Sequence, residues 1–160
     1  MSQSIPDKAV VVAALERVLQ EELAAVERVA AMARDEVSSG ETRSEGKYDT
    51  RATEASYLAR GQAWRVVELR RLAAWFARLD PTRTCTQAEA GALVLLGGHR
   101  RTLALIAPVG GPAAEVEGWR VGTLSLRSPL GQALEELEAG DPFEVDTPAG
   151  LVEYEILAVR

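Results

Sequence analysis

The sequence predicts an α+β protein in which a long antiparallel helical hairpin precedes a small domain of about five antiparallel strands and one short helix. Apolar residues recur every three or four positions between Val12 and Leu79, which is the period of an amphipathic helix. After Asp80-Pro81, short apolar runs alternate with glycine-containing turns, which is typical of strands. We therefore divide the chain into a hairpin at residues 1–80, a connector at 81–90 and a C-terminal domain at 91–160, and we expect residues 1–79 and 86–160 to fold separately.

Composition and charge exclude several classes of function. Residues 1–79 carry 12 basic and 12 acidic groups and residues 80–160 carry 6 and 12, so neither half has the basic excess that direct binding of duplex DNA requires. One cysteine, Cys85, excludes an intramolecular disulfide and a cysteine-based zinc site. One histidine, His99, excludes a catalytic triad and a multi-histidine metal centre. No signal peptide or stretch of about 20 apolar residues is present, so we expect a cytoplasmic protein.

The first helix is predicted to begin at Pro6-Asp7, where an acidic residue favours a helix N-terminus. It runs for about 30 residues, or about 45 Å at the rise of an α-helix. A helix of that length needs a partner helix along its apolar side. The apolar series is Val12, Leu15, Leu19, Leu23, Val26, Ala30, Ala33 and Val37.

A second helical pattern, from about Thr50 to Leu79, supplies that partner. Asp80-Pro81 ends it, because the residue before a proline disfavours the helical region. Two helices of matched length with a short link predict an antiparallel hairpin. The seam of the second helix is Ala55, Ala59, Gln62, Val66, Leu69, Ala73 and Phe76.

The link between the two helices is acidic. Because it lies at the far end of the hairpin, no core is available there to neutralise its charges, and a solvated polar turn is one interpretation. The other is a functional acidic tip. The segment has three basic residues, Arg43, Lys47 and Arg51, and six acidic ones. The acidic residues are Asp35, Glu36, Glu41, Glu45, Asp49 and Glu54.

The C-terminal domain is predicted from short apolar runs and turns. Ser128 is a good N-cap, Pro129 suits the first helical position, and Gly140 is the predicted end of that helix. His99 is predicted to lie in the turn of a β-hairpin. The predicted strands are Ala92–Leu96, Arg101–Ile106, Trp119–Leu126, Phe143–Asp146 and Leu151–Val159.

The C-terminal domain carries a series of motifs in a fixed order. Ser128-Pro129-Leu130-Gly131-Gln132-Ala133-Leu134 is followed by Gly140-Asp141, then by Pro148-Ala149-Gly150 and the strand Tyr154 to Val159. Their order and spacing resemble those of the bacterial Gre (GreA/GreB) transcription elongation factors. The long helical hairpin with an acidic tip resembles the other half of that family. The likeness implies a coiled coil followed by a C-terminal domain of FK506-binding-protein-like (FKBP-like) fold.

The resemblance also implies a function and a partner. The globular domain is expected to dock on bacterial RNA polymerase through Ser128, Pro129, Leu130, Gly131 and Gln132, and the coiled coil to enter the secondary channel. There the resemblance implies that the tip carboxylates help to hold a Mg²⁺ shared with the polymerase active site and stimulate cleavage of backtracked RNA. The protein itself is then not an enzyme, binds no cofactor alone, contacts nascent RNA only indirectly and does not enter a membrane.

The tip departs from the family pattern, which has an Asp and a Glu three residues apart shortly before a Tyr. With Tyr57 aligned to that Tyr, Thr50 and Thr53 stand at the acidic positions, and each acid lies one position outside. One residue rotates a helical side chain by about 100°. Asp49 and Glu54 are the first candidates for catalysis and for the shared Mg²⁺, with Glu41 and Glu45 as substitutes.

Other interpretations stay open. A channel-binding regulator without cleavage activity is the main alternative, and a coiled-coil adaptor is another. A peptidyl-prolyl isomerase requires an aromatic pocket, for which the domain offers only Trp119, Phe143 and Tyr154. The acidic run Glu135 to Glu138 replaces basic residues of the family and is either a solvated face or an altered docking contact. Arginines along the second helix either pair with the first helix or contact RNA or the channel wall: Arg60, Arg65, Arg70, Arg71 and Arg78.

Overall fold

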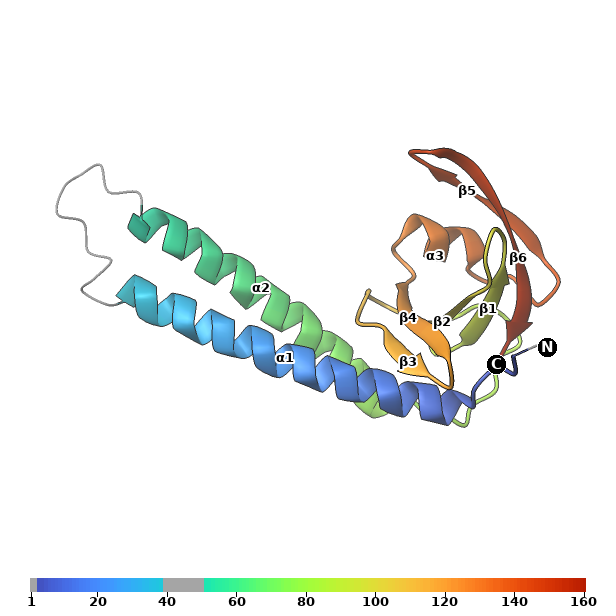
Figure 1. Ribbon diagram of the computed structural model, residues 1–160, viewed down its shortest axis with the longest axis horizontal. Helices are drawn as coiled ribbons and strands as arrows, with labels where there is room; N and C mark the ends of the chain where they lie inside the picture. The colour runs from blue at the N-terminus through green and yellow to red at the C-terminus, as the bar shows by residue number, and fades with distance from the viewer. Residues whose placement is uncertain (1–2, 39–50) are drawn as a thin grey trace.

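Figure 1 shows a computed structural model in which a long helical hairpin projects from one side of a β-sheet domain; it describes residues 3–38 and 51–160. The predicted fold class is confirmed. The helices are α1 (Lys8–Ser38), α2 (Arg51–Arg78) and α3 (Pro129–Leu134), and the strands are β1 (Leu93–Gly97), β2 (Thr102–Ala107), β3 (Ala114–Val116), β4 (Trp119–Ser125), β5 (Pro142–Thr147) and β6 (Gly150–Val159).

The hairpin forms where the two apolar patterns predict it. The carboxylate of Asp7 accepts a hydrogen bond from the backbone N–H of Ala9 at 3.2 Å, which satisfies one free donor of the first turn. Along the hairpin, Arg65 pairs with Glu22 at 2.6 Å and Arg70 with Glu27 at 2.7 Å. The two helices therefore pack by their apolar seams and are linked by ion pairs at their flanks.

The sheet differs in two details from the predicted five antiparallel strands. It has six strands in the order β3-β4-β2-β1-β6-β5, and β2 pairs with β4 in parallel. The additional strand, β3, lies in the connection from β2 to β4. It turns into β4 through Glu117 and Gly118, which both have positive φ (50° and 82°), as the tightest hairpin turns require.

The core lies on both faces of the sheet. Alternate residues of β1 face opposite sides: Leu93 and Leu95 pack with the base of α1 and α2, whereas Val94 and Leu96 pack on the side of α3. On the helical side, Leu15, Leu72 and Phe76 are among the buried residues of that cluster. The hairpin and the sheet therefore share one core. The division at residues 80 and 91 stays a prediction, and this packing is the reason to test it.

Lys8 ties the start of the hairpin to the sheet domain. Its side chain is only 6% exposed. The ammonium group donates to the carbonyl oxygens of Arg83, Gly91 and Arg160, so its three protons all have acceptors. It also lies 3.7 Å from the Sγ of Cys85. One side chain thus joins α1, the connector, the approach to β1 and the residue that follows β6.

The helix α3 is shorter than predicted. It ends at Leu134, with Glu135 as its cap, and not at Gly140. The reason is a pair of backbone hydrogen bonds to the connector, from Glu136 N–H to the Ala88 carbonyl (2.8 Å) and from Ala88 N–H to the Leu137 carbonyl (2.7 Å). Gly140 instead adopts a positive φ of 97° in the turn before β5. Among residues 3–38 and 51–160, no helix is long and apolar enough to cross a membrane.

Candidate functional site

Only one of the predicted tip carboxylates can be placed. Glu54 is exposed in the first turn of α2, where the helix dipole favours a negative charge. Asp49, Glu41 and Glu45 lie outside the described residues. Within the described ranges no group of three or more His, Cys, Asp or Glu residues could hold a metal ion. An exposed carboxylate suits Mg²⁺ when other donors come from a second molecule, since this ion usually keeps waters and binds one or two carboxylates plus phosphates.

An exposed face of α2 beside Glu54 combines aromatic and basic side chains. Tyr57, Arg60, Trp64 and Val67 are spaced by three or four residues and therefore share one side of the helix. The side chains of Tyr57 and Trp64 are 64% and 61% exposed. The guanidinium of Arg60 lies 4.6 Å from the centre of the Tyr57 ring, within the range of a cation–π contact. The pattern predicted from the sequence covers only the buried seam of α2 and not this outward series, although the spacing of Tyr57, Arg60 and Trp64 is visible in the sequence.

Some arginines of α2 pair with α1, and others point to solvent, where they are available for contact with RNA or the channel wall. Arg65 and Arg70 pair with α1, as predicted for a structural role. Arg60 stacks on Tyr57, and Arg78 donates to the backbone carbonyl of Ala74 at 3.3 Å. Arg71 is exposed on the same helix. The outward arginines thus remain on the solvent side of the hairpin.

The predicted docking turn is a tightly capped helix start. The hydroxyl of Ser128 accepts a hydrogen bond from Gly131 N–H at 3.0 Å and donates to the carbonyl of Ser125 at 2.7 Å. Position 131 requires glycine, because a Cβ there would lie 2.0 Å from the carbonyl oxygen of Ser125. The Ser-Pro-Leu-Gly motif is therefore explained by local geometry.

The side chains of this turn point in different directions. Leu130 is half-buried and packs against the apolar cluster on the α3 side of the sheet, whereas Pro129 and Gln132 are exposed. The turn thus anchors itself through Leu130 and presents Pro129 and Gln132 to solvent. The acidic side chains Glu135, Glu136 and Glu138 that follow are also exposed.

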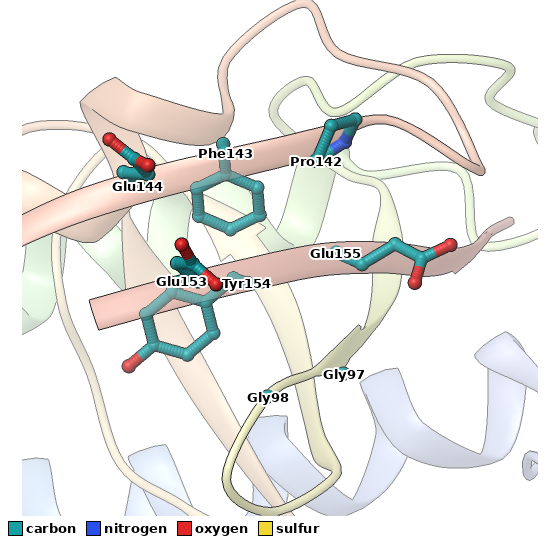
Figure 2. A pocket seen from close by; sticks show the side chains of 8 residues that line it. All are labelled: Gly97, Gly98, Pro142, Phe143, Glu144, Glu153, Tyr154 and Glu155. Carbon is teal, nitrogen blue, oxygen red and sulfur yellow. The ribbon is translucent and has the colours of Figure 1, made fainter.

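The three aromatic residues of the isomerase alternative do not form one pocket. Trp119 packs in the cluster on the hairpin side, where its indole N–H donates to the carbonyl of Ser4 at 3.0 Å. Phe143 and Tyr154 belong to the other cluster and stack on each other, with ring centres 5.3 Å apart and planes 14° apart. Figure 2 shows these two rings side by side on β5 and β6, near Gly97 and Gly98.

Comparisons with known proteins agree with the motifs of this domain. Residues 114–160, which include the capped turn, match the family model described as "Transcription elongation factor, GreA/GreB, C-term". The chain is 36% identical over 100 residues to transcription elongation factor GreA of Paracoccus denitrificans and 34% identical over 97 residues to GreA of Cereibacter sphaeroides. Each match covers 60% of this chain and 60% of the relative, so the likeness spans less than two thirds of the length of those proteins.

Solved structures give a looser likeness over more of the chain. GreA factor homolog 1 (Gfh1) of Thermus thermophilus has a TM-score of 0.39 at 20% identity, covering 92% of this chain and 95% of that one. A GreA/GreB factor from Nitrosomonas europaea has a TM-score of 0.35 at 18% identity, covering 67% and 91%. Residues 114–160 thus match the C-terminal part of the GreA/GreB transcription elongation factors, and the capped Ser128–Gly131 turn lies within the matched segment.

Proposed function

We propose that this protein is an accessory factor of bacterial RNA polymerase that docks through the Ser128–Gln132 turn and extends its hairpin into the secondary channel. The observation that carries the proposal is the capped turn, which lies inside the segment matched to the family and exposes Pro129 and Gln132. The relatives are named as transcription elongation factors, and we transfer that role to this chain. In this role the protein is not itself an enzyme and modifies the activity of the polymerase.

The shape of the molecule supports insertion of the hairpin. The 31 residues of α1 span about 46 Å at 1.5 Å per residue, and the hairpin projects freely from the sheet (Figure 1). The exposed face of Tyr57, Arg60 and Trp64 is then the part that meets the channel wall, because large exposed aromatic side chains mark interaction surfaces. Contact with nascent RNA is indirect in this arrangement.

The finer proposal is that the tip stimulates cleavage of backtracked RNA. Glu54, together with Asp49, would then contribute carboxylate oxygens to a Mg²⁺ that the polymerase also binds. Such an ion stabilises the attacking and leaving oxygens of phosphodiester hydrolysis. The chain supplies only part of the donor set, so the site is complete only in the complex. No cofactor is needed by the protein alone.

A non-cleaving regulator is the second candidate, and one observation favours it. Asp49 and Glu54 are five residues apart, and Thr50 and Thr53 occupy the positions where the family pattern has its acids. A factor with this tip occupies the channel and changes initiation or elongation without supplying metal ligands. The two candidates share the docking step and differ only in the outcome for the transcript.

Docking is tested by replacing Gln132 with glutamate. Because Gln132 is exposed and Leu130 is half-buried, Gln132→Glu leaves the fold intact, whereas a charge at Leu130 would disturb the core. We expect at least a tenfold loss of affinity for RNA polymerase, about 1.4 kcal/mol, with an unchanged far-UV circular dichroism spectrum. The control is Gln20→Glu, the same change at an exposed position of α1. Equal affinity of Gln132→Glu and wild type contradicts docking through this turn.

Cleavage is tested on a stalled, backtracked transcription complex. If Asp49 and Glu54 support the metal, Asp49→Ala and Glu54→Ala each lower the cleavage rate at least tenfold, or about 1.4 kcal/mol of transition-state stabilisation. Glu41→Ala is the comparison, and all variants are measured at matched polymerase occupancy. Polymerase affinity should change little. Absence of cleavage by the wild-type protein, with docking intact, decides for the non-cleaving regulator.

A further inference from the structure

We propose that the free edge of β6, beside the β1–β2 turn, binds an extended segment of a partner protein in which basic and apolar side chains alternate. This inference concerns a second interaction surface and stands apart from the proposed function. It rests on three features: an unpaired length of strand, a hollow alongside it, and opposite characters on the two faces of the β5–β6 ribbon.

The free edge exists because β6 extends beyond the end of its neighbour β1. β6 pairs with β5 over Gly150–Glu155, but with β1 only from Glu155 to Val159. On the β1 side, residues 150–154 therefore have no strand partner in the described part of the chain. Gly98 lies against Glu153 and Tyr154, so residues 150–152 form the open edge, which is about 10 Å long. Their backbone N–H and C=O groups on that side are a template for another strand.

A groove follows this edge. It has a volume of about 750 Å³ and lies between Gly97-Gly98, where β1 ends, and the ribbon formed by β5 and β6. A second hollow continues it between His99 and Leu151–Glu153. Gly98 closes the groove at the β1 end, because a Cβ there would lie 3.0 Å from the ring of Tyr154 and 3.4 Å from the carbonyl oxygen of Glu153. An extended chain therefore has room beside residues 150–152 of β6.

The two faces of the ribbon differ in character. Phe143 is paired with Tyr154, and these rings stack on the face toward α3. Glu144 is paired with Glu153 on the opposite face, since successive residues of a strand alternate. Figure 2 shows the aromatic pair with the two glutamates at one end and Glu155 at the other. A strand added to this edge meets rings on one side and carboxylates on the other.

The paired glutamates indicate the charge of the occupant. Like charges directly opposite each other destabilise a sheet, and among the described residues no ion pair involves Glu144, Glu153 or Glu155. Charges at a strand edge also prevent pairing with copies of the same chain. The negative charges of Glu144 and Glu153 therefore favour a partner strand with basic side chains. Its side chains alternate, basic toward Glu144 and Glu153 and apolar toward Tyr154.

The test uses a fluorescein-labelled nine-residue peptide in which lysine and valine alternate. Its binding to the full chain is followed by fluorescence anisotropy. A block peptide of the same composition, five lysines followed by four valines, is the control for charge alone. We expect the alternating peptide to bind at least tenfold more tightly than the block peptide. The backbone amide signals of residues 151–154 should shift on binding, as followed by NMR.

Two double variants with equal changes in charge locate the site. Glu144→Gln/Glu153→Gln should weaken binding of the alternating peptide at least tenfold. Glu115→Gln/Glu117→Gln, in β3 and in the turn that follows it at the opposite edge of the sheet, should change it less than twofold. The first variant should also melt at the same or a higher temperature than wild type, because it removes a like-charge pair.

Four results overturn the proposal. They are equal binding of the two peptides, equal weakening by the two double variants, no binding of the alternating peptide, and a lower melting temperature for Glu144→Gln/Glu153→Gln. Self-association of the wild-type chain that this variant abolishes, seen by analytical ultracentrifugation, instead assigns the edge to a second copy.

Discussion

Lys8 shows how one side chain decides the relation between the two halves of the molecule. A buried ammonium needs an acceptor for each proton, because an unsatisfied charge is expensive to bury. The carbonyls of Arg83, Gly91 and Arg160 meet that need. The position is also one where the dipole of α1 disfavours a cation. The free energy of these hydrogen bonds therefore outweighs the unfavourable interaction with the helix dipole. Tertiary contacts hold the buried ammonium in place.

Replacing this lysine by a methionine tests its contribution. Lys8→Met keeps the aliphatic length but leaves three carbonyl groups without their donor, and each unsatisfied buried group costs about 1–3 kcal/mol. We expect the free energy of unfolding to fall by about 2–4 kcal/mol, measured by urea denaturation. The control is Arg17→Met, an exposed position of the same helix, with an expected change within about 0.5 kcal/mol. Similar stability of the two variants contradicts the role given to Lys8.

Residue-scale chemistry also explains what the sequence could and could not reveal about the candidate site. Ser128 and Pro129 were recognisable as a helix start because capping depends on neighbouring residues. The need for glycine at 131 depends on Ser125, whose carbonyl occupies the space of a Cβ, and that approach arises only in the folded turn. The like-charge pair of Glu144 and Glu153 depends on strand register and became visible only with the sheet.

At the scale of elements, long periodic segments were predictable and short ones were not. The apolar periods of α1 and α2 extend over many turns, so they identified both helices. The strand β3 has only three residues, too few to show alternation, although Glu117-Gly118 is a turn signal. The predicted end of α3 was wrong because backbone hydrogen bonds between Ala88 and the segment after Leu134 end the helix. A local sequence pattern does not indicate a hydrogen-bond partner that is so distant in the sequence.

The hairpin offers a comparison between packing and ion pairs. Leu69 is 1% exposed in the seam of α2, so Leu69→Ala should lower the free energy of unfolding by about 2–5 kcal/mol. Arg65 and Arg70 are partly exposed, and solvent screening limits each of their pairs to about 0–1 kcal/mol. Thermal denaturation of Leu69→Ala, Arg65→Ala and Arg70→Ala separates these contributions. A larger loss from either arginine than from Leu69 contradicts this ranking.

At the scale of the whole molecule, the core shared by the hairpin and the sheet bears on the predicted separation into two folding units. The connector is not a free linker, since Cys85 and Ala88 are 5% and 0% exposed. Removal of the hairpin uncovers the apolar face that includes Leu93 and Leu95. Such exposure opposes independent folding of the remaining part.

Limited proteolysis combined with thermal unfolding tests that separation. We expect residues 82–90 to resist cleavage and the described core to unfold in a single transition by circular dichroism and tryptophan fluorescence. A fragment containing only residues 86–160 should be less stable than the whole chain. Ready cleavage in the connector, with release of a stable C-terminal fragment, would support the two-unit prediction from the sequence instead.

The attachment of the hairpin has a mechanical consequence. The base of the hairpin is fixed by Lys8 and by the packing of Leu15, Leu72 and Phe76 against the sheet, so the part of α1 beyond Leu15 acts as a lever about 35 Å long. A rotation of only 10° at the base moves the far end of α1 by about 6 Å, on the same helical rise. Small changes in the packing beneath α1 and α2 are therefore magnified at the tip. We therefore expect a substitution at Lys8 to shift the position of Glu54, although the two side chains lie at opposite ends of the hairpin.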